Sequence, residues 1–276
     1  MYGIVKARAV TFVLAVLMAS TAVPAVGADT AAMIETAMNG AHRSDAYTAR
    51  NQHRHPKETL LFFGLRPDMT VVEITPGGGW YTEILAPVLR EQGKYYAASY
   101  LITDKSPEFF RRMDRNYRAK LASAPDIYDR VELVHFDAMA PEFAPAGSAD
   151  MVLTFRNVHN WAKAGRADKM FRGFAAALKP GGILGVVEHR AKPGTPFEQQ
   201  VRSGYMTEEY VIETARKAGF RLLEKSEVNA NPLDTADHPG GVWNLPPNLR
   251  NVPDADIDKM RAIGESDRMT LMFVVD

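Results

Sequence analysis

The segment from residue 71 to residue 86 constrains the fold of this chain more than any other. An apolar run with one acid, residues 71–75, leads through Pro76 into three consecutive glycines, and residues 80–86 then have the character of a helix start. A strand, a glycine turn and a helix N-terminus let the backbone approach a ligand, because a Cβ would block the approach or forbid positive φ angles. The segment therefore predicts a ligand site at the end of a strand.

From residue 70 onward, strand-like runs alternate with helix-like segments. Several of the runs are apolar almost without interruption, as expected for strands buried on both faces. The alternation predicts an α/β fold, doubly wound, in which a mostly parallel sheet carries helices on both faces. The predicted strands are residues 71–75, 94–100, 131–136, 151–155, 183–188, 221–228 and 269–275.

Two of the predicted helices carry aromatic stripes at helical spacing. The first helix begins near Pro107, and the second ends at residues 179–182. We expect both stripes to face the core rather than a ligand. Their members are Phe109, Phe110, Met113, Tyr117 and Leu121 in the first helix, and Met170, Phe171, Phe174, Ala175 and Leu178 in the second. A third helix is expected to be capped by Thr207 and to stop at Gly219.

Residues 29–55 are predicted to form an N-terminal helical extension. Thr30 is expected to cap a helix that runs to Met38, and Pro56 is expected at the first position of the next helix. The extension ends in a basic cluster made of Arg50, His53, Arg54 and His55. Two histidines bind a metal only with further ligands, so we interpret the cluster as a solvated face rather than a metal site.

The first 28 residues have the layout of a secretory signal peptide. Lys6 and Arg8 precede an apolar run, residues 9–17, and small residues follow up to Ala28, after which we expect cleavage. A membrane anchor is the alternative, but the run is short for a bilayer span. The chain has no cysteine, which suits an oxidising compartment. We expect export to the periplasm, with no stable membrane span after cleavage.

The composition excludes several classes of binding partner and of catalytic site. The chain has 33 basic and 33 acidic residues in interspersed order, which is not the pattern of a nucleic-acid-binding surface. Without cysteine, thiolate nucleophiles and cysteine-based metal sites are excluded. No pattern specifies an oligomeric state. Residues 229–266 are polar, rich in proline and contain Trp243, and a segment of this length predicts a loop or lid insertion.

The order of the motifs resembles one family. The glycine loop, Asp137 after the third strand, residues 154–161 and the turn at residues 179–182 follow one another as in the class I S-adenosylmethionine-dependent methyltransferases. More narrowly, the chain is similar to exported bacterial proteins described only as predicted methyltransferases. The resemblance covers roughly residues 56–276, which form the predicted methyltransferase-like domain. It implies a seven-stranded Rossmann-like sheet with a reversed last strand, S-adenosylmethionine as cofactor, and an unknown small-molecule or exported methyl acceptor.

The resemblance also implies roles for single residues. Glu73 anchors the glycine loop and attracts the ammonium group of the cofactor, while Asp137 accepts a hydrogen bond from the adenine amine. An aspartate that caps the next helix is the alternative for Asp137. The implied cofactor-binding residues are Glu73, Thr75, Gly77, Gly78, Gly79, Ser99 and Asp137.

The chain departs from the family at two places. Thr75 stands where the family often has glycine. The second strand ends without the acid that usually binds the ribose hydroxyls, so Ser99 or Asp104 is the predicted substitute.

The predicted catalytic residues follow the fourth strand and are His159, Asn157 and Arg156. Ligands of doubly wound folds bind at this carboxyl edge, and a histidine can accept the proton of a nucleophile near neutral pH. Arg156, Asn157 and Trp161 could orient a substrate beside His159. The alternative is a histidine that only bonds to a neighbouring loop. His189 is a second candidate base, although an exposed histidine at the end of a strand explains it better.

Two other functions compete with a methyltransferase. The first is a non-catalytic periplasmic binding or accessory protein on a degenerate methyltransferase scaffold, which the missing ribose acid favours. The second is a nicotinamide-dependent dehydrogenase. Thr82 stands where the dinucleotide fingerprint requires its third glycine, which argues against that function.

Overall fold

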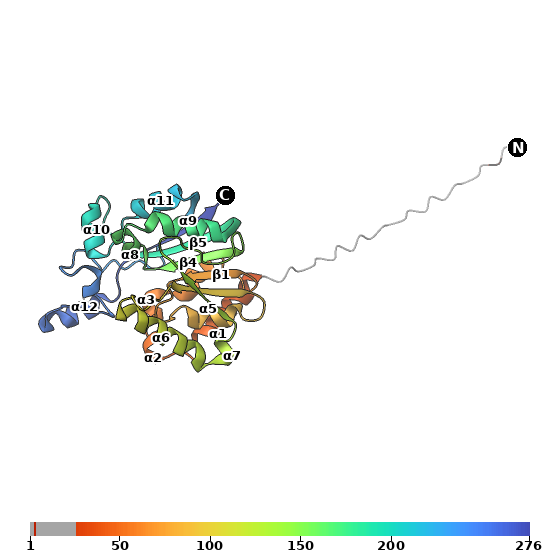
Figure 1. Cartoon of the computed structure of the whole chain (residues 1–276), viewed down its shortest axis with the longest axis horizontal. Coiled ribbons are helices and arrows are strands. Elements are labelled where there is room, and N and C mark those ends of the chain that lie inside the picture. Colours follow the sequence, from red (N-terminus) through yellow and green to blue (C-terminus); the bar gives the residue numbers. More distant parts are fainter. Residues whose placement is uncertain (1–2, 4–25) are drawn as a thin grey trace.

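The architecture is a seven-stranded sheet between two layers of helices (Figure 1). The structure is a computed structural model that describes residue 3 and residues 26–276. The strand order is β3-β2-β1-β4-β5-β7-β6, and β7 is antiparallel to both of its neighbours, whereas the other pairs are parallel. The strands are β1 Thr70–Ile74, β2 Lys94–Tyr100, β3 Val131–Phe136, β4 Ala149–Phe155, β5 Leu178–His189, β6 Phe220–Ser226 and β7 Arg268–Val275.

This sheet confirms the predicted fold class and the reversed last strand. The predicted strands agree with the observed ones to within two residues at most ends. The exception is β5, which begins at Leu178 and therefore takes up residues 179–182, predicted as a turn after the preceding helix. Gly181 has a φ of 76° there, and the pairing register with β4 shifts between Ala149 and Met151. An irregular strand start replaces the expected turn.

Helices cover both faces of the sheet. Figure 1 shows α8, α9, α10 and α11 on one side and α1, α2, α5, α6 and α7 on the other. The helices are α1 Val26–Met38, α2 Asp45–Thr48, α3 Asn51–Arg54, α4 Pro56–Phe62, α5 Thr82–Leu89, α6 Glu108–Ser123, α7 Pro125–Tyr128, α8 Val158–Lys163, α9 Ala167–Ala177, α10 Phe197–Ser203, α11 Glu208–Lys217 and α12 Ile257–Ile263. Each face buries its own apolar cluster against the sheet, which is the general plan of doubly wound folds.

The helix ends match the sequence in two of three cases. The Thr207 hydroxyl accepts a hydrogen bond from the backbone N of Tyr210 at 3.2 Å, so it caps α11 as predicted. Pro56 begins α4, also as predicted. The prediction for Thr30 is wrong, because α1 already begins at Val26 and holds Asp29 in its first turn. An acid in the first turn interacts favourably with the helix dipole and extends the helix beyond the expected cap.

The two aromatic stripes differ in how far they are buried. The stripe of α9 is buried, and Met170, Phe171 and Phe174 have no exposed surface. On α6, however, Phe109 is 56% exposed and Phe110 is 38% exposed. The prediction that both stripes face the core is therefore wrong for the first turns of α6, where the chain leaves apolar side chains beside the carboxyl edge of the sheet.

The segment before the sheet and the segment between β6 and β7 meet at that edge, where Arg50 and Arg54 pair with Glu265. Residues 229–266 contain two short 3-10 helices, η1 Gly241–Asn244 and η2 Asp254–Asp256, followed by α12. Most of the predicted signal peptide lies outside the described residues. Within the described part, no helix is long and apolar enough to cross a membrane.

Candidate active site

The glycine loop leaves the carboxyl end of β1 in an unusual backbone conformation. Thr75, Gly77 and Gly79 have φ angles of 54°, 62° and 79°, a region that side chains with a Cβ rarely adopt and that is strained for a β-branched residue. The backbone N of Thr75 donates to the carbonyl of Ala98 at 2.7 Å and holds the loop against β2. A Cβ at Gly77 would meet no atom within 4 Å. The loop thus turns bare backbone toward open space.

The N-terminal extension covers the other side of this loop. The Tyr47 hydroxyl donates to the carbonyl of Gly78 at 3.1 Å, and the indole of Trp80 donates to the carbonyl of Tyr47 at 3.0 Å. A Cβ at Gly78 would lie 2.4 Å from the Tyr47 hydroxyl. Gly78 is therefore needed for packing against Tyr47, whereas Gly77 faces the cavity.

Glu73 is buried beneath the loop in a network of hydroxyl groups. Its carboxylate accepts hydrogen bonds from the hydroxyls of Tyr95 and Thr82, and Thr82 also bonds to the Tyr117 hydroxyl at 2.9 Å. Burial raises the pKa of Glu73 to about 7 against the lowering effect of these bonds. The carboxylate ties β1 to α5, β2 and α6, which fits the predicted anchoring role, and it also lines a cavity of about 230 Å³ beside the glycines.

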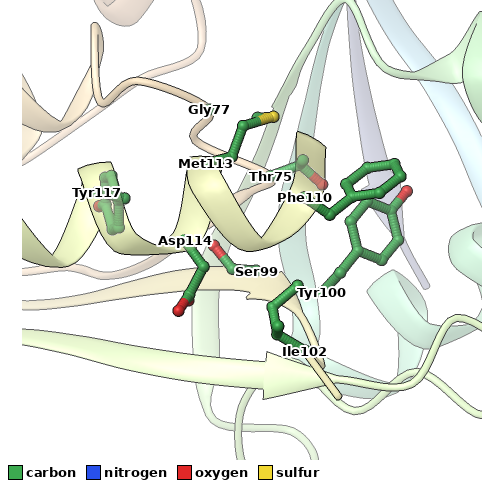
Figure 2. Close-up of a pocket in the computed structure, with 9 residues that line it drawn as sticks. All are labelled: Thr75, Gly77, Ser99, Tyr100, Ile102, Phe110, Met113, Asp114 and Tyr117. Carbon is green, nitrogen blue, oxygen red and sulfur yellow. The ribbon is translucent and has the colours of Figure 1, made fainter. Parts of the chain in front are cut away.

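A small pocket of about 30 Å³ lies between the glycine loop, the end of β2 and α6, and Figure 2 shows its lining residues. Ser99 lies at its base, as predicted for a cofactor contact, whereas Asp104 is exposed on a loop and is not among the lining residues. The acid of this pocket is Asp114. Asp114 belongs to α6, which is why a search for an acid on β2 does not find it.

Asp114 is held in its ionised form. Burial of its carboxyl opposes ionisation, but a hydrogen bond from Arg118 at 2.8 Å and the contact with His135 at 3.2 Å prevail and lower its pKa. Nearby, the Thr75 hydroxyl is buried without a well-formed hydrogen bond to any described residue. A ligand with hydroxyl groups would find a fixed carboxylate here, beside the hydroxyls of Thr75 and Tyr100.

Asp137 is exposed, and one of its carboxylate oxygens accepts a hydrogen bond from the backbone N of Met139 at 2.8 Å. It closes a turn after β3 rather than capping a helix. Asp137 does not line the described pockets that contain Ser99 and Gly77.

His159 combines both alternatives raised from the sequence. Its Nδ1 lies 3.0 Å from Oε1 of Glu188, whose Oε2 accepts a hydrogen bond from the backbone N of His159 at 3.2 Å. Because a carboxylate only accepts hydrogen bonds, Nδ1 carries the proton and Nε2 is left as a proton acceptor. His159 also lines the largest described cleft, of about 670 Å³. Glu188, which belongs to the neighbouring strand β5, orients the ring of His159.

The other predicted residues of this segment divide into two groups. Asn157 donates to the carbonyl of Ile74 at 3.0 Å and lines the cleft, so it braces β1 against β4. Arg156 has a φ of 61° and lines cavities on both sides of it. Trp161, in contrast, is 1% exposed and donates to the Tyr100 hydroxyl at 2.8 Å. The prediction that Trp161 orients a substrate is wrong, because the indole belongs to the core.

The basic cluster before the sheet is not a solvated face. Arg54 is 2% exposed and its Nε lies 3.2 Å from Glu265, while Nε of Arg50 lies 2.5 Å from the same carboxylate. His189 is likewise half-buried rather than exposed, and burial together with nearby cations holds its pKa well below the ordinary value. The sequence does not show this arrangement because Glu265 is more than 200 positions away.

His159, Glu188 and His189 also place potential ligand atoms within 4.8 Å of one another. The Glu188 oxygens already accept bonds from two backbone N–H groups and from His159. Nδ1 of His189 bonds to the Ser266 hydroxyl at 2.6 Å, and Arg156 lies close enough to lower the pKa of His189. Filled oxygens and neighbouring cations disfavour a metal ion, so we interpret the trio as a hydrogen-bonded base and its support.

The residues fit a nucleoside ligand with an amino-acid portion. The cleft of about 670 Å³ shares Thr75, Tyr100 and Met113 with the Ser99 pocket and shares Thr75 and Asn157 with the cavity beside the glycines. The open space at Gly77 is a cradle that a Cβ would fill. The ionised Asp114 can receive hydroxyl groups. These features form one continuous surface at the carboxyl edge of the sheet, where doubly wound folds bind ligands.

Comparison with solved structures shows the same fold in proteins of low sequence identity. A methyltransferase from Aquifex aeolicus that depends on S-adenosylmethionine is 16% identical with a TM-score of 0.56, and the match covers 89% of this chain and 98% of that chain. The [4+2]-cyclase SpnF is 18% identical with a TM-score of 0.53, covering 81% and 80%. A possible exported protein from Bordetella parapertussis is 15% identical with a TM-score of 0.50, covering 89% and 79%. No significant match to a curated protein was found.

The sequence profile of a family described as a methyltransferase domain matches residues 72–186. The match begins in β1, ends in β5 and includes the glycine loop, Ser99, Asp114 and His159. Residues 72–186 thus resemble a methyltransferase domain, and the seven-stranded sheet with its reversed last strand is the fold that this chain shares with the solved methyltransferase structures.

Proposed function

We propose that the protein transfers a methyl group from S-adenosylmethionine to an acceptor that binds in the cleft beside His159. The observation that carries the proposal is that the residues bordering the glycine loop and a candidate base line the same cleft. The cleft of about 670 Å³ brings Thr75 and Asn157, which border the glycine loop, to the same wall as His159. A base that Glu188 holds in a defined tautomer thereby shares a cavity with the cofactor surface.

The proposed mechanism needs little from the protein beyond positioning and one proton acceptor. S-adenosylmethionine, when bound, supplies an electrophilic methyl group on a sulfonium. The glycine loop and the Ser99–Asp114 pocket bind and orient the cofactor, and the partly apolar cleft walls at Tyr100 and Trp243 reduce contact with water. Nε2 of His159 accepts the proton that the nucleophile of the acceptor loses. His159→Gln should lower kcat by about 10²–10⁴-fold and leave cofactor affinity nearly unchanged.

Binding of the cofactor is the first test. Isothermal titration of the purified chain, residues 29–276, with S-adenosylhomocysteine and S-adenosylmethionine should show one site for each. Mass spectrometry of ligands retained during purification supports the same test. If neither compound produces heat of binding or is retained, the proposal fails.

A second candidate is a binding or accessory protein without catalysis. One observation favours it: the Glu73 carboxylate is already occupied by Tyr95 and Thr82, and burial brings its pKa to about 7. A half-protonated, occupied acid attracts a cofactor ammonium less than a free carboxylate does. Methylated product that forms with the wild-type chain and disappears with Gly77→Val would rule this candidate out.

We also propose that the protein is exported to the periplasm. The support is the basic and apolar order of residues 6–17, the small residues up to Ala28 and the lack of cysteine. Cell fractionation with intact-mass measurement of the mature chain tests this proposal. Mature protein that begins at residue 29 in the periplasmic fraction is expected, and full-length protein in the cytoplasm would contradict it.

A further inference from the structure

A cavity of about 250 Å³ lies next to the proposed cofactor surface, at the edge where the N-terminal extension meets the segment after residue 240. Its polar lining consists mainly of Arg50, Arg54, Arg156, His189 and Glu265. Val242, Trp243 and two prolines form the opposite, apolar wall.

The charges around this cavity do not balance. Glu265 forms ion pairs with three arginines, with N···O distances of 2.5 Å to Arg50, 3.2 Å to Arg54 and 2.8 Å to Arg268. Arg156 is a fourth arginine that influences Glu265 electrostatically. One carboxylate therefore faces four guanidinium groups, and three positive charges remain without a partner of their own.

Two of these guanidinium groups also have unused donors. The Arg54 side chain is 3% exposed, and its Nη1 is buried without a hydrogen bond to any described residue. Arg156 makes no side-chain hydrogen bond or ion pair with residues 26–276, although it lines the cavity. Burial lowers the pKa of Arg156 to about 10, with Arg268 adding to the effect. A guanidinium donor that is shielded from water without an acceptor is costly, so the free Nη1 of Arg54 and the half-buried Arg156 fit a ligand that supplies negative charge.

The Glu188 carboxylate lies within 4.8 Å of a ring nitrogen of His189, but His159 and two backbone N–H groups already occupy its oxygens. Burial lowers the pKa of His189, so the ring stays neutral at pH 7 and contributes no charge to the cavity. Glu73 reaches Arg156 only electrostatically and has a pKa of about 7. Tyr81 is also within electrostatic reach, but burial raises its pKa to about 12 and it remains neutral.

The cofactor does not remove the net excess of positive charge, although Arg50, Arg54 and Arg156 also line the cavity beside the glycines. The amino-acid portion of the cofactor carries one ammonium and one carboxylate, which cancel, and its sulfonium adds a positive charge. Binding of S-adenosylmethionine therefore increases the excess of positive charge beside the arginines. A second ligand with net negative charge would restore the balance.

We propose that this cavity binds the anionic group, a carboxylate or a phosphate, of an organic methyl acceptor whose apolar body lies against Trp243. Guanidinium groups bind both anions in a bidentate manner. The assignment of the anion to a methyl acceptor rests on the proposed function, whereas the anion site itself does not.

The test uses benzoate and inorganic phosphate as probes on the wild-type chain, Arg156→Gln and the control Arg250→Gln. Arg250 lines the wide cleft but not the arginine cavity. At constant ionic strength, a probe at tenfold its Kd should raise the Tm of the wild type and of the control by about 3–6 °C. Arg156→Gln should remove this increase and weaken the probe at least tenfold in direct titration. Without the probe, its Tm should equal or exceed that of the wild type, because an unpaired cation is removed.

Titration with S-adenosylhomocysteine separates this proposal from the proposed function. We expect Arg156→Gln to change that affinity less than threefold. An equal loss of S-adenosylhomocysteine and probe affinity would mean that the arginines hold the cofactor carboxylate, and it would overturn the proposal. Equal probe stabilisation of the wild type and Arg156→Gln, or no heat when the wild type is titrated with either probe, would also overturn it. Probe binding without S-adenosylhomocysteine binding would support the anion site and refute the proposed function.

Discussion

The cleft of about 670 Å³ adjoins two smaller cavities that are built in different ways: the cofactor end beside the glycines and the arginine end, which is the cavity of about 250 Å³. The cofactor end is largely local in sequence, because residues from Glu73 to Tyr81 supply half of the residues that line its cavity. Arg50, Arg54 and Arg156 line this cavity too. The arginine end combines residues 50–54, Arg156 and residues 265–268, which only the fold brings together. The first end has a backbone shape that suits a ligand, whereas the second has a charge that requires one.

Two buried carboxylates show the same contrast. Glu73 is 3% exposed and bonds to neutral hydroxyls, so burial raises its pKa to about 7. Glu265 is 5% exposed, but the surrounding arginines outweigh the effect of burial and hold its pKa far below the ordinary value. Burial alone thus does not decide the charge of an acid in this protein; its partners do.

The largest expected effect follows from removing the acid that holds the arginines together. Glu265→Gln leaves Arg50, Arg54 and Arg268 without their shared partner, and it should lower the free energy of unfolding by about 3–5 kcal/mol. Urea unfolding followed by circular dichroism measures it. Glu213→Gln, which removes an exposed pair with Arg216, is the control and should leave stability unchanged. A loss below about 1 kcal/mol for Glu265→Gln would show that the cluster is not a stabilising unit.

The contribution of Glu73 to the free energy of unfolding should fall as the pH rises. Its pKa is raised from 4.5 to about 7 on folding, so the folded chain keeps a proton that the unfolded chain releases. The stability from this proton is fully present below pH 4.5 and is lost as the pH rises through about 7, by on the order of 3 kcal/mol. Glu73→Gln should remove this part of the pH dependence. Parallel stability curves for the two proteins between pH 4.5 and 8 would disprove the assignment.

Gly77 tests the shape of the cofactor end. Gly77→Val places a β-branched side chain at a φ of 62° and into the open space of the cavity, and it should weaken S-adenosylhomocysteine at least about 100-fold, or about 2.8 kcal/mol. Gly147→Val is a matched control, because Gly147 has a φ of 61° and open space but precedes β4 at the opposite edge. Both variants should lose similar stability, and only Gly77→Val should lose affinity. If both variants lost similar affinity for S-adenosylhomocysteine, the loss would come from impaired folding rather than from a blocked cofactor site.

The smallest expected effect concerns the tautomer of His159. Glu188→Gln can offer an amide N–H to Nδ1, so the population of the Nδ1–H tautomer should fall without loss of the fold. Nitrogen-15 NMR of the imidazole rings measures this population. His135, which lies 3.2 Å from Asp114, is an internal control in the same spectra. An unchanged His159 signal would mean that Glu188 does not orient the ring.

The sequence predicted the features that depend on neighbouring residues. The strands, the glycine loop and the Thr207 cap follow from local pattern and backbone conformation. The stripe of α6 was misinterpreted, because helical periodicity shows that one face is apolar but not whether the core or a cleft covers it. Asp114 and the arginine cavity were missed for a related reason: their function depends on which distant segments the fold brings beside them.

The most direct test of the account is a crystal structure with S-adenosylhomocysteine. We expect the ligand to contact the backbone from Thr75 to Gly79, with its ribose near Ser99 and Asp114, and to leave the arginine cavity free for a second, anionic ligand. A ligand elsewhere, or one whose carboxylate fills the space between Arg54 and Arg156, would contradict the division of the cleft into a cofactor end and an anion end.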